Sequence, residues 1–256
     1  MTYLTKILEE KKREIVELEK EKPLQRYLDQ QGSLALTRDF TSALKRTDRG
    51  LRLIAEIKKA SPSRGLIVNN FDPVAMAHHY GELGAAAYSV LTDHLFFQGS
   101  NDYLQTVSRS FSLPVLRKEF IIDESQIFQS RLIGADAILL IVAALDPCQL
   151  SDYLQLATNI GLHVLVEVHD RQELDTAIEN GAAIIGVNNR NLKDFSIDLQ
   201  TAVILRPFIP SDKVTVAESG IKTSADITLI DQALFDAVLI GEGLHTSPEL
   251  FDITWS

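Results

Sequence analysis

Short apolar runs recur along the chain from residue 51 to residue 240 and are typical of buried β-strands. Several begin with a small turn, and a glycine directly before such a run is a signal for the end of a helix. The run that begins at Phe235 is a degenerate copy, because it has no such glycine. The eight runs are Leu51–Ile57, Gly84–Leu91, Pro114–Lys118, Gly134–Val142, His163–Val168, Gly181–Val187, Val214–Ser219 and Phe235–Ile240.

The stretches between these runs show helix-like patterns. Examples are Pro73–Leu83, Glu124–Leu132, Pro147–Ile160, Arg171–Asn180 and Ser224–Leu234. Alternation of strand and helix predicts parallel strands, and near-continuous apolar strands fit a sheet covered on both faces. Eight such units predict an α/β fold, a (β/α)8 TIM barrel. An open doubly wound sheet is the alternative, but no G-x-G-x-x-G turn follows the first strand.

Residues 1–48 precede the eight units. Apolar side chains recur near helical spacing between Tyr3 and Lys20, with Lys and Glu between them, and Pro23 is expected to end this helix. We therefore expect one barrel domain, 1–256, with 1–48 as an N-terminal helical extension packed against it. A free charged tail is the alternative.

Charged and amide side chains collect where the predicted strands end. Glu56 and Lys58 lie two residues apart, so a strand points both to the same side. Burying such charges is costly unless they are paired, and chains often accept that cost at an active site. Further polar residues at strand ends are Lys118, Glu167, Asn188 and Glu218. In a barrel these ends meet at the C-terminal face, where catalysis takes place. Taken singly, each has a simpler interpretation as an ion pair or a turn residue.

The last two predicted strands end in Ser219-Gly220 and Gly241-Glu242-Gly243. Loops in these positions of a barrel often bind phosphate, and glycine lets backbone N–H groups approach an anion. With Ser61 nearby, these turns predict a phosphate site, although each glycine fits an ordinary turn as well. Glu242 should repel a phosphate unless its carboxylate points away.

Composition narrows the class of protein. Apolar residues make up 45% of the 256 residues, enough for a sizeable core, and the net charge of −10 argues against a nucleic-acid partner. The single cysteine, Cys148, allows no intrachain disulfide and fits a reducing compartment. The N-terminus has no apolar signal core, and no run approaches a membrane span of about 20 residues. We expect a cytoplasmic protein without a membrane partner. The six histidines show no metal-ligand spacing.

With these residues collected, the chain resembles the indole-3-glycerol-phosphate synthase family from the N-terminal helix to the last strand. The most specific match is IAEIKKASPSRG at residues 54–65. Supporting matches are Leu91-Thr-Asp93 with Phe97 and Gly99, Leu116–Phe120, Leu165–Glu167, Gly186–Arg190 and Ala217–Ile221, and Leu239–Gly243 matches more loosely. Glu119 stands where many members carry Asp, and Glu242 where some offer a hydroxyl.

The resemblance implies a barrel enzyme of tryptophan biosynthesis that needs no metal or organic cofactor. Its substrate would be 1-(2-carboxyphenylamino)-1-deoxyribulose 5-phosphate, and its products indole-3-glycerol phosphate, carbon dioxide and water. It implies Lys118 as the general acid at the ribulose carbonyl oxygen and Glu167 as the base in the dehydration. Lys58, oriented by Glu56, would stabilise charge or protonate the departing hydroxyl, although the motifs do not settle which lysine acts at which step.

The resemblance also implies the remaining contacts. Asn188 and Ser219 would hydrogen-bond the reacting centre, and Glu218 and Arg190 would complete the polar shell. The phosphate would be held by Ser61, Gly220, Gly241 and Glu242, the last through its backbone. An aromatic substrate needs apolar walls, for which the candidates are Phe97, Phe120, Leu139, Leu192 and Ile221, all of which also suit an ordinary core.

Two other functions fit parts of the pattern. A neighbouring phosphosugar isomerase of the same pathway would carry cysteine on the first strand, where this chain has Glu56 and Lys58. A non-catalytic phosphate-binding barrel would not need both lysines and Glu167. The expected partner is a small phosphorylated aromatic substrate, and the expected state is a monomer or weak homodimer.

Overall fold

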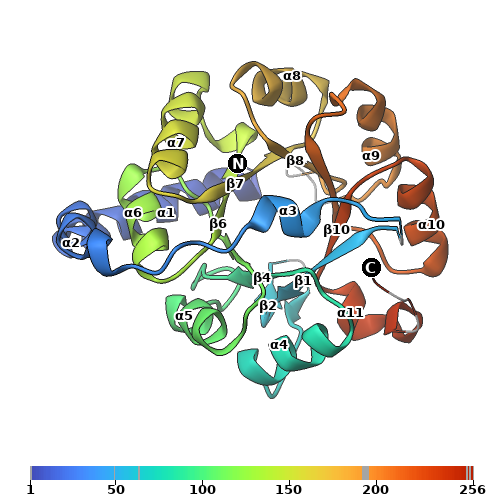
Figure 1. Cartoon of the computed structure of the whole chain (residues 1–256), viewed down its shortest axis with the longest axis horizontal. Helices are drawn as coiled ribbons and strands as arrows, with labels where there is room; N and C mark the ends of the chain where they lie inside the picture. Colours follow the sequence, from blue (N-terminus) through green and yellow to red (C-terminus); the bar gives the residue numbers. More distant parts are fainter. Residues whose placement is uncertain are drawn as a thin grey trace.

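Eight parallel strands close into a barrel in the computed structural model (Figure 1). The structure describes residues 2–48, 50–62, 64–191, 196–251, 253 and 255. The barrel strands are β1 Arg52–Ile57, β4 Ala87–Leu91, β5 Val115–Lys118, β6 Ala137–Ile141, β7 His163–Val168, β8 Ile184–Asn188, β9 Val214–Glu218 and β10 Ala237–Ile240. Each pairs with the next barrel strand along the chain, and β10 pairs with β1 to close the ring. This closure confirms the predicted (β/α)8 fold and excludes the open sheet.

Helices connect the barrel strands and surround them (Figure 1). They are α4 Pro73–Glu82, α5 Asn101–Ser110, α6 Glu124–Leu132, α7 Pro147–Asn159, α8 Arg171–Glu179, α9 Gln200–Leu205, α10 Ser224–Gln232 and α11 Gly243–Thr246. Short 3-10 turns are η2 Val142–Ala144, η3 Arg206–Phe208 and η4 Pro248–Phe251, and β2 Ala60–Ser61 forms a small hairpin with β3 Gly65–Leu66. The five predicted helices are confirmed to within a few residues, whereas α5, α9 and α11 were not predicted.

Polar side chains fix where the outer helices begin. Asp72, Asp123, Asp146 and Asp170 each accept a backbone N–H from the first turn of the helix that follows. Such N-caps satisfy N–H groups that have no partner inside a helix. They therefore end the loop that follows each strand at a defined residue.

The core consists of two shells, as near-continuous apolar strands require. Inward-facing side chains such as Leu116, Leu165 and Val216 fill the barrel, while outward-facing ones such as Val166 and Ile185 pack under the helices. Both sets are fully buried. A filled barrel leaves room for a site only at its ends.

The N-terminal segment covers both ends of the barrel. It contains α1 Tyr3–Lys20, α2 Pro23–Gln30, η1 Gln31–Ser33 and α3 Phe40–Leu44. Phe40 and Leu44 of α3 join the inner shell, and Figure 1 looks at the end that α3 covers, with α1 on the far side. The predicted helix Tyr3–Lys20 is confirmed, but Pro23 begins α2 rather than only ending α1.

Glycines at three helix ends adopt the left-handed backbone conformation that the sequence predicts. Gly84, Gly134 and Gly181 have φ angles of +93°, +88° and +80°. Leu234 takes the equivalent place before β10 with φ +62°. The degenerate fourth copy therefore keeps the same turn with a residue that is disfavoured in it. Within the described ranges, no helix is both long and apolar enough to cross a bilayer.

Candidate active site

A cavity opens at the C-terminal ends of the strands, on the side of the barrel where α1 lies. Every predicted site residue that the structure describes lines it: Glu56, Lys58, Ser61, Phe97, Lys118, Phe120, Leu139, Glu167, Asn188, Arg190, Glu218, Ser219, Gly220, Ile221, Gly241 and Glu242. Leu192 lies outside the described residues. The predicted convergence of polar strand ends is therefore present in the folded chain.

The register of the strands explains this convergence. Glu167 of β7 stands opposite Gly186 of β8, and Asn188 of β8 stands opposite Glu218 of β9. A Cβ at Gly186 would overlap the Glu218 carboxylate, and one at Gly241 would overlap that of Glu56. A side chain at either position would therefore displace a carboxylate of the cluster.

Lys118 lies at the centre of the polar cluster. Its Nζ donates to Glu218 Oε2 at 2.6 Å and to Glu167 Oε2 at 3.0 Å. Burial lowers the pKa of Lys118, but the charges of Glu167 and Glu218 outweigh burial and raise the pKa above its ordinary value. The lysine is therefore a cation held between two carboxylates.

The two carboxylates differ in their affinity for protons. Burial raises the pKa of Glu167, but Lys118 and His169 together bring it below its ordinary range. Burial also raises the pKa of Glu218, and Lys118 offsets only part of this, so the pKa rises to about 7. Glu167 is thus ionised at neutral pH, whereas Glu218 titrates between its protonated and ionised forms near pH 7.

Glu56 and Lys58 form a second ion pair in the same cavity. Tyr80 of α4 lies behind this pair, and its hydroxyl is 3.1 Å from His245 Nε2 of α11. Burial, together with the Glu56 charge, raises the pKa of Tyr80. The two lysines therefore occupy different settings, because Lys118 contacts two carboxylates and Lys58 contacts one.

The loops after β9 and β10 form the other end of the cavity. Ser219 and Gly220 have φ angles of +64° and +86°, so this turn is left-handed at both positions. Glu242 pairs with Arg64 at 2.9 Å and with Lys222 at 3.3 Å. These cations neutralise the carboxylate that the sequence suggested would repel a phosphate.

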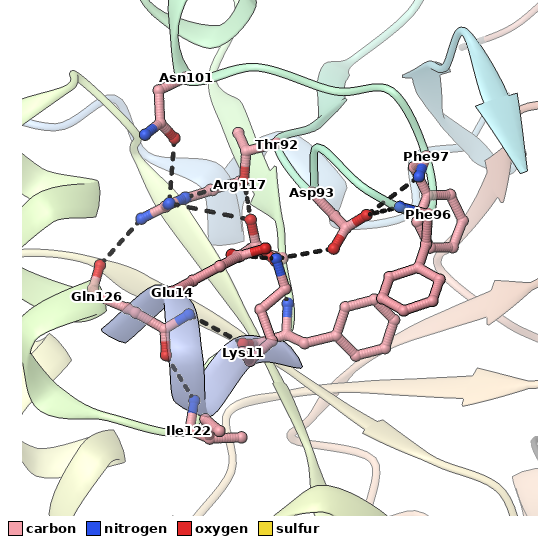
Figure 2. Close-up of polar contacts among 12 residues, drawn as sticks. Lys11, Glu14, Thr92, Asp93, Phe96, Phe97, Asn101, Arg117, Ile122 and Gln126 are labelled. Atoms are coloured by element: carbon pink, nitrogen blue, oxygen red, sulfur yellow. Dashed lines mark hydrogen bonds and ion pairs between the residues drawn. The ribbon is translucent and has the colours of Figure 1, made fainter. Parts of the chain in front are cut away.

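A second buried polar cluster joins α1 to the wall of the cavity (Figure 2). Lys11 of α1 is fully buried, and its Nζ lies 2.7 Å from Asp93 and 3.0 Å from Glu119. Asp93 also accepts the N–H groups of Phe96 and Phe97. The helix is thus tied to the loop that carries one apolar wall.

Arg117 completes this cluster on the outer side of β5 (Figure 2). It is buried and donates to Thr92 Oγ1 at 3.1 Å and to the carbonyl oxygen of Gln126 at 3.0 Å. Each polar group therefore has a partner, as buried charges require.

Some residues near the cavity were not identified from the sequence. Leu4 and Ile7 of α1 line it, although their apolar pattern predicted only packing against the barrel. His169, to which the sequence analysis assigned no functional role, contacts Glu167 and Glu173.

A closed parallel barrel with paired lysines and carboxylates at its C-terminal face has the architecture of (β/α)8-barrel enzymes, which carry their active sites at that face. The sequence model of the family "Indole-3-glycerol phosphate synthase" matches residues 4–253. The chain belongs to the indole-3-glycerol phosphate synthase family, whose members are decarboxylating lyases of tryptophan biosynthesis. The family and reaction class predicted from the sequence are confirmed.

Relatives of this name are similar over the whole chain. The indole-3-glycerol phosphate synthase of Pelodictyon phaeoclathratiforme is 77% identical, with 100% of both chains covered. That of Chlorobium limicola is 69% identical, covering 100% of this chain and 99% of its own. A solved structure titled "Native KDPGal structure" has a TM-score of 0.55 and 17% identity, over 81% of this chain and 89% of its own. This last similarity concerns the fold alone.

Proposed function

We propose that the cavity converts 1-(2-carboxyphenylamino)-1-deoxyribulose 5-phosphate into indole-3-glycerol phosphate, carbon dioxide and water. The observation that carries this proposal is Lys118 held between Glu167 and Glu218, in the same cavity as the Glu56–Lys58 pair. Ring closure needs an acid at the carbonyl oxygen, and dehydration needs both an acid and a base. The cluster supplies these groups within one pocket.

In the first step, the aromatic carbon attacks the ribulose carbonyl carbon and Lys118 donates a proton to the oxygen. A lysine with a raised pKa remains a suitable donor here, because the developing alkoxide is a far stronger base than the amine. Carbon dioxide then leaves, and the bonding electrons restore the aromatic ring.

In the second step, Glu167 removes a proton from the closed ring and Lys58 protonates the departing hydroxyl, so that water leaves. Proton loss from Lys118 removes one cation that keeps the pKa of Glu167 low. The base therefore becomes stronger at the stage when it is needed. Glu56 orients Lys58, and Asn188 and Ser219 hydrogen-bond the reacting centre, while Glu218 and Arg190 complete the polar shell.

The phosphate is proposed to bind at the turns after β9 and β10. Ser61, Gly220, Gly241 and the backbone of Glu242 surround this end of the cavity, and Arg64 and Lys222 hold the Glu242 carboxylate. Phe97, Phe120, Leu139 and Ile221 would enclose the aromatic ring, and Leu192 remains a sequence-based candidate. All proton transfers use side chains, so the proposed reaction needs no metal or organic cofactor.

We also propose that 1–256 is one barrel domain with 1–48 as its helical extension, which the burial of Lys11 against Asp93 supports. The net charge of −10 supports the absence of a nucleic-acid partner. A single, exposed Cys148 supports a cytoplasmic setting. A monomer or weak homodimer remains the proposed state.

The test is to incubate the purified protein with the anthranilate-linked ribulose phosphate and follow indole fluorescence. Lys118→Met should lose nearly all turnover, and Glu167→Gln should bind substrate while dehydrating it slowly. Lys12→Met, at an exposed position on α1, is the matched control and should keep full activity. An inactive but folded wild type would refute the proposed function, and an active Lys118→Met would refute the assigned acid.

A further inference from the structure

His169 lies just beyond the end of β7, two residues after Glu167. Its Nε2 is 3.3 Å from Glu167 Oε1, whereas the other oxygen, Oε2, receives the contact from Lys118. The carboxylate is therefore held from both sides, by a lysine that lines the cavity and by a histidine that does not.

Glu173, in the first turn of α8, fixes the histidine. Its Oε2 is 2.9 Å from His169 Nδ1 and accepts the backbone N–H of His169 at 2.8 Å. Two contacts from one carboxylate leave the imidazole little freedom to turn. The side chain of His169 is only 11% exposed, so solvent does not compete strongly for it.

We propose that His169, held by Glu173, is a positioning residue that binds Glu167 Oε1 and leaves Oε2 as the oxygen that takes the proton. The inference rests on the proposed function, in which Glu167 is the base. It adds a chain of contacts behind the cavity, from Glu173 on α8 through the His169 imidazole to Glu167 on β7. These contacts orient the carboxylate of Glu167, as a carboxylate orients the histidine in other proton-transfer sites.

The charges support this arrangement. Burial lowers the pKa of His169, but its contacts with Glu167 and Glu173 outweigh burial and raise the pKa to about 10. Among the described residues, the titratable groups in contact with the imidazole are Glu167 on β7 and Glu173 on α8, and Lys118 of β5 lies across the Glu167 carboxylate. His169 is thus a cation that favours the ionised form of Glu167.

A simpler role as a buried structural histidine makes different predictions. Loss of a structural histidine would lower the stability of the protein. The molecules that remain folded would keep the same pH dependence of activity. Loss of a positioning cation raises the pKa of Glu167, because the ionised form loses a favourable charge. The acid limb of the kcat/KM profile that reports Glu167, which lies on the acid side of an ordinary glutamate pKa and apart from that of Glu218, then moves to higher pH.

The experiment compares His169→Ala and His169→Gln with His163→Gln. His163 is the matched control because it begins the same strand at the opposite end, where it contacts Thr41. For His169→Ala we expect kcat to fall about 10- to 100-fold with KM nearly unchanged, and the acid limb to move up by about one pH unit. His169→Gln keeps a polar side chain beside Glu167 but not the charge, so part of kcat should return while its acid limb stays shifted.

An independent measurement is the titration of the histidine side chains by NMR with nitrogen-15 label. The resonance that is missing in His169→Gln identifies His169 among the six histidines. It should remain in the imidazolium form at pH 8, and its midpoint should fall in Glu167→Gln and in Glu173→Gln.

The outcomes separate the two proposals. A wild type that does not convert the substrate counts against the proposed function. A His169 midpoint that is unchanged in Glu167→Gln counts against the contact itself. An active wild type whose His169→Ala variant keeps its acid limb and loses kcat only in proportion to its folded fraction would overturn the positioning role.

Discussion

At the scale of single residues, one lysine organises two carboxylates with opposite pKa shifts. Glu167 also contacts His169, whereas Glu218 has only part of its burial offset by Lys118. Both are buried to a similar degree, but Glu167 meets two cations, whereas Glu218 meets one and is also repelled by the charges of Glu167 and Glu56. The same residue type therefore supplies an ionised base and a group that titrates near neutral pH.

This difference predicts how Glu218→Gln changes stability with pH. The folded-state pKa of Glu218 is raised from 4.5 to about 7, so its contribution is complete below the unfolded value and is lost as pH rises through 7. Between pH 5 and pH 8 the free energy of unfolding of the wild type should fall by up to about 3 kcal/mol more than that of the variant. Urea unfolding of both proteins at the two pH values measures this difference. Equal losses in the wild type and the variant would contradict the prediction.

At the scale of elements, the turn between α10 and β10 differs from the glycine turns that precede β4, β6 and β8. Leu234 adopts φ +62° and is 63% exposed, so its side chain contributes little packing to offset an unfavourable backbone conformation. The exposed leucine therefore marks a place where the repeat is not optimal.

We expect Leu234→Gly to stabilise the fold by about 0.5–1 kcal/mol, because glycine adopts this conformation without strain. The control is Gly134→Ala, where φ is +88° and the new Cβ would lie 3.1 Å from Ser108 Oγ. That variant should destabilise the protein. Thermal unfolding measures both changes, and a loss of stability in Leu234→Gly would show that its side chain matters more than its backbone.

The N-terminal helix is held to the barrel by a buried charge rather than by apolar packing alone. Lys11 contacts Asp93 and Glu119, both buried, and Lys11→Met would leave Asp93 without this cation and Glu119 with Arg117 at 4.0 Å. We expect a loss of about 3 kcal/mol in the free energy of unfolding. The exposed Lys12→Met should change it by less than about 0.5 kcal/mol. Equal effects of the two substitutions would mean that the buried cluster does not hold α1.

At the scale of the whole molecule, anion binding should stabilise the fold although the chain is strongly acidic. A ligand that binds only the folded state adds about 2.7 kcal/mol at a concentration 100 times its Kd. Inorganic phosphate should therefore raise the Tm in a concentration-dependent way, relative to sodium chloride at equal ionic strength. Gly241→Ala should reduce this shift, because its Cβ would overlap Glu56, while Gly32→Ala, in open space, should not. A shift that chloride reproduces would argue against a phosphate site.

The sequence by itself determined the order of strands and helices and the end of the barrel at which charge collects. Eight apolar runs with polar residues at their ends allow few other arrangements, since parallel strands bring their C-terminal ends together. The match at residues 54–65 and the polar strand ends therefore predicted most of the charged and polar side chains that line the described cavity.

Only the tertiary structure decided the contacts between elements distant in sequence. Apolar spacing showed that α1 packs on the barrel, but not that Ile7 lines the cavity or that Lys11 reaches Asp93. Likewise, the pairing of Glu242 with Lys222 resolves a charge that the sequence left unexplained. Periodicity within a segment specifies which face is buried, whereas the partner of a buried charge is specified only when the chain closes around it.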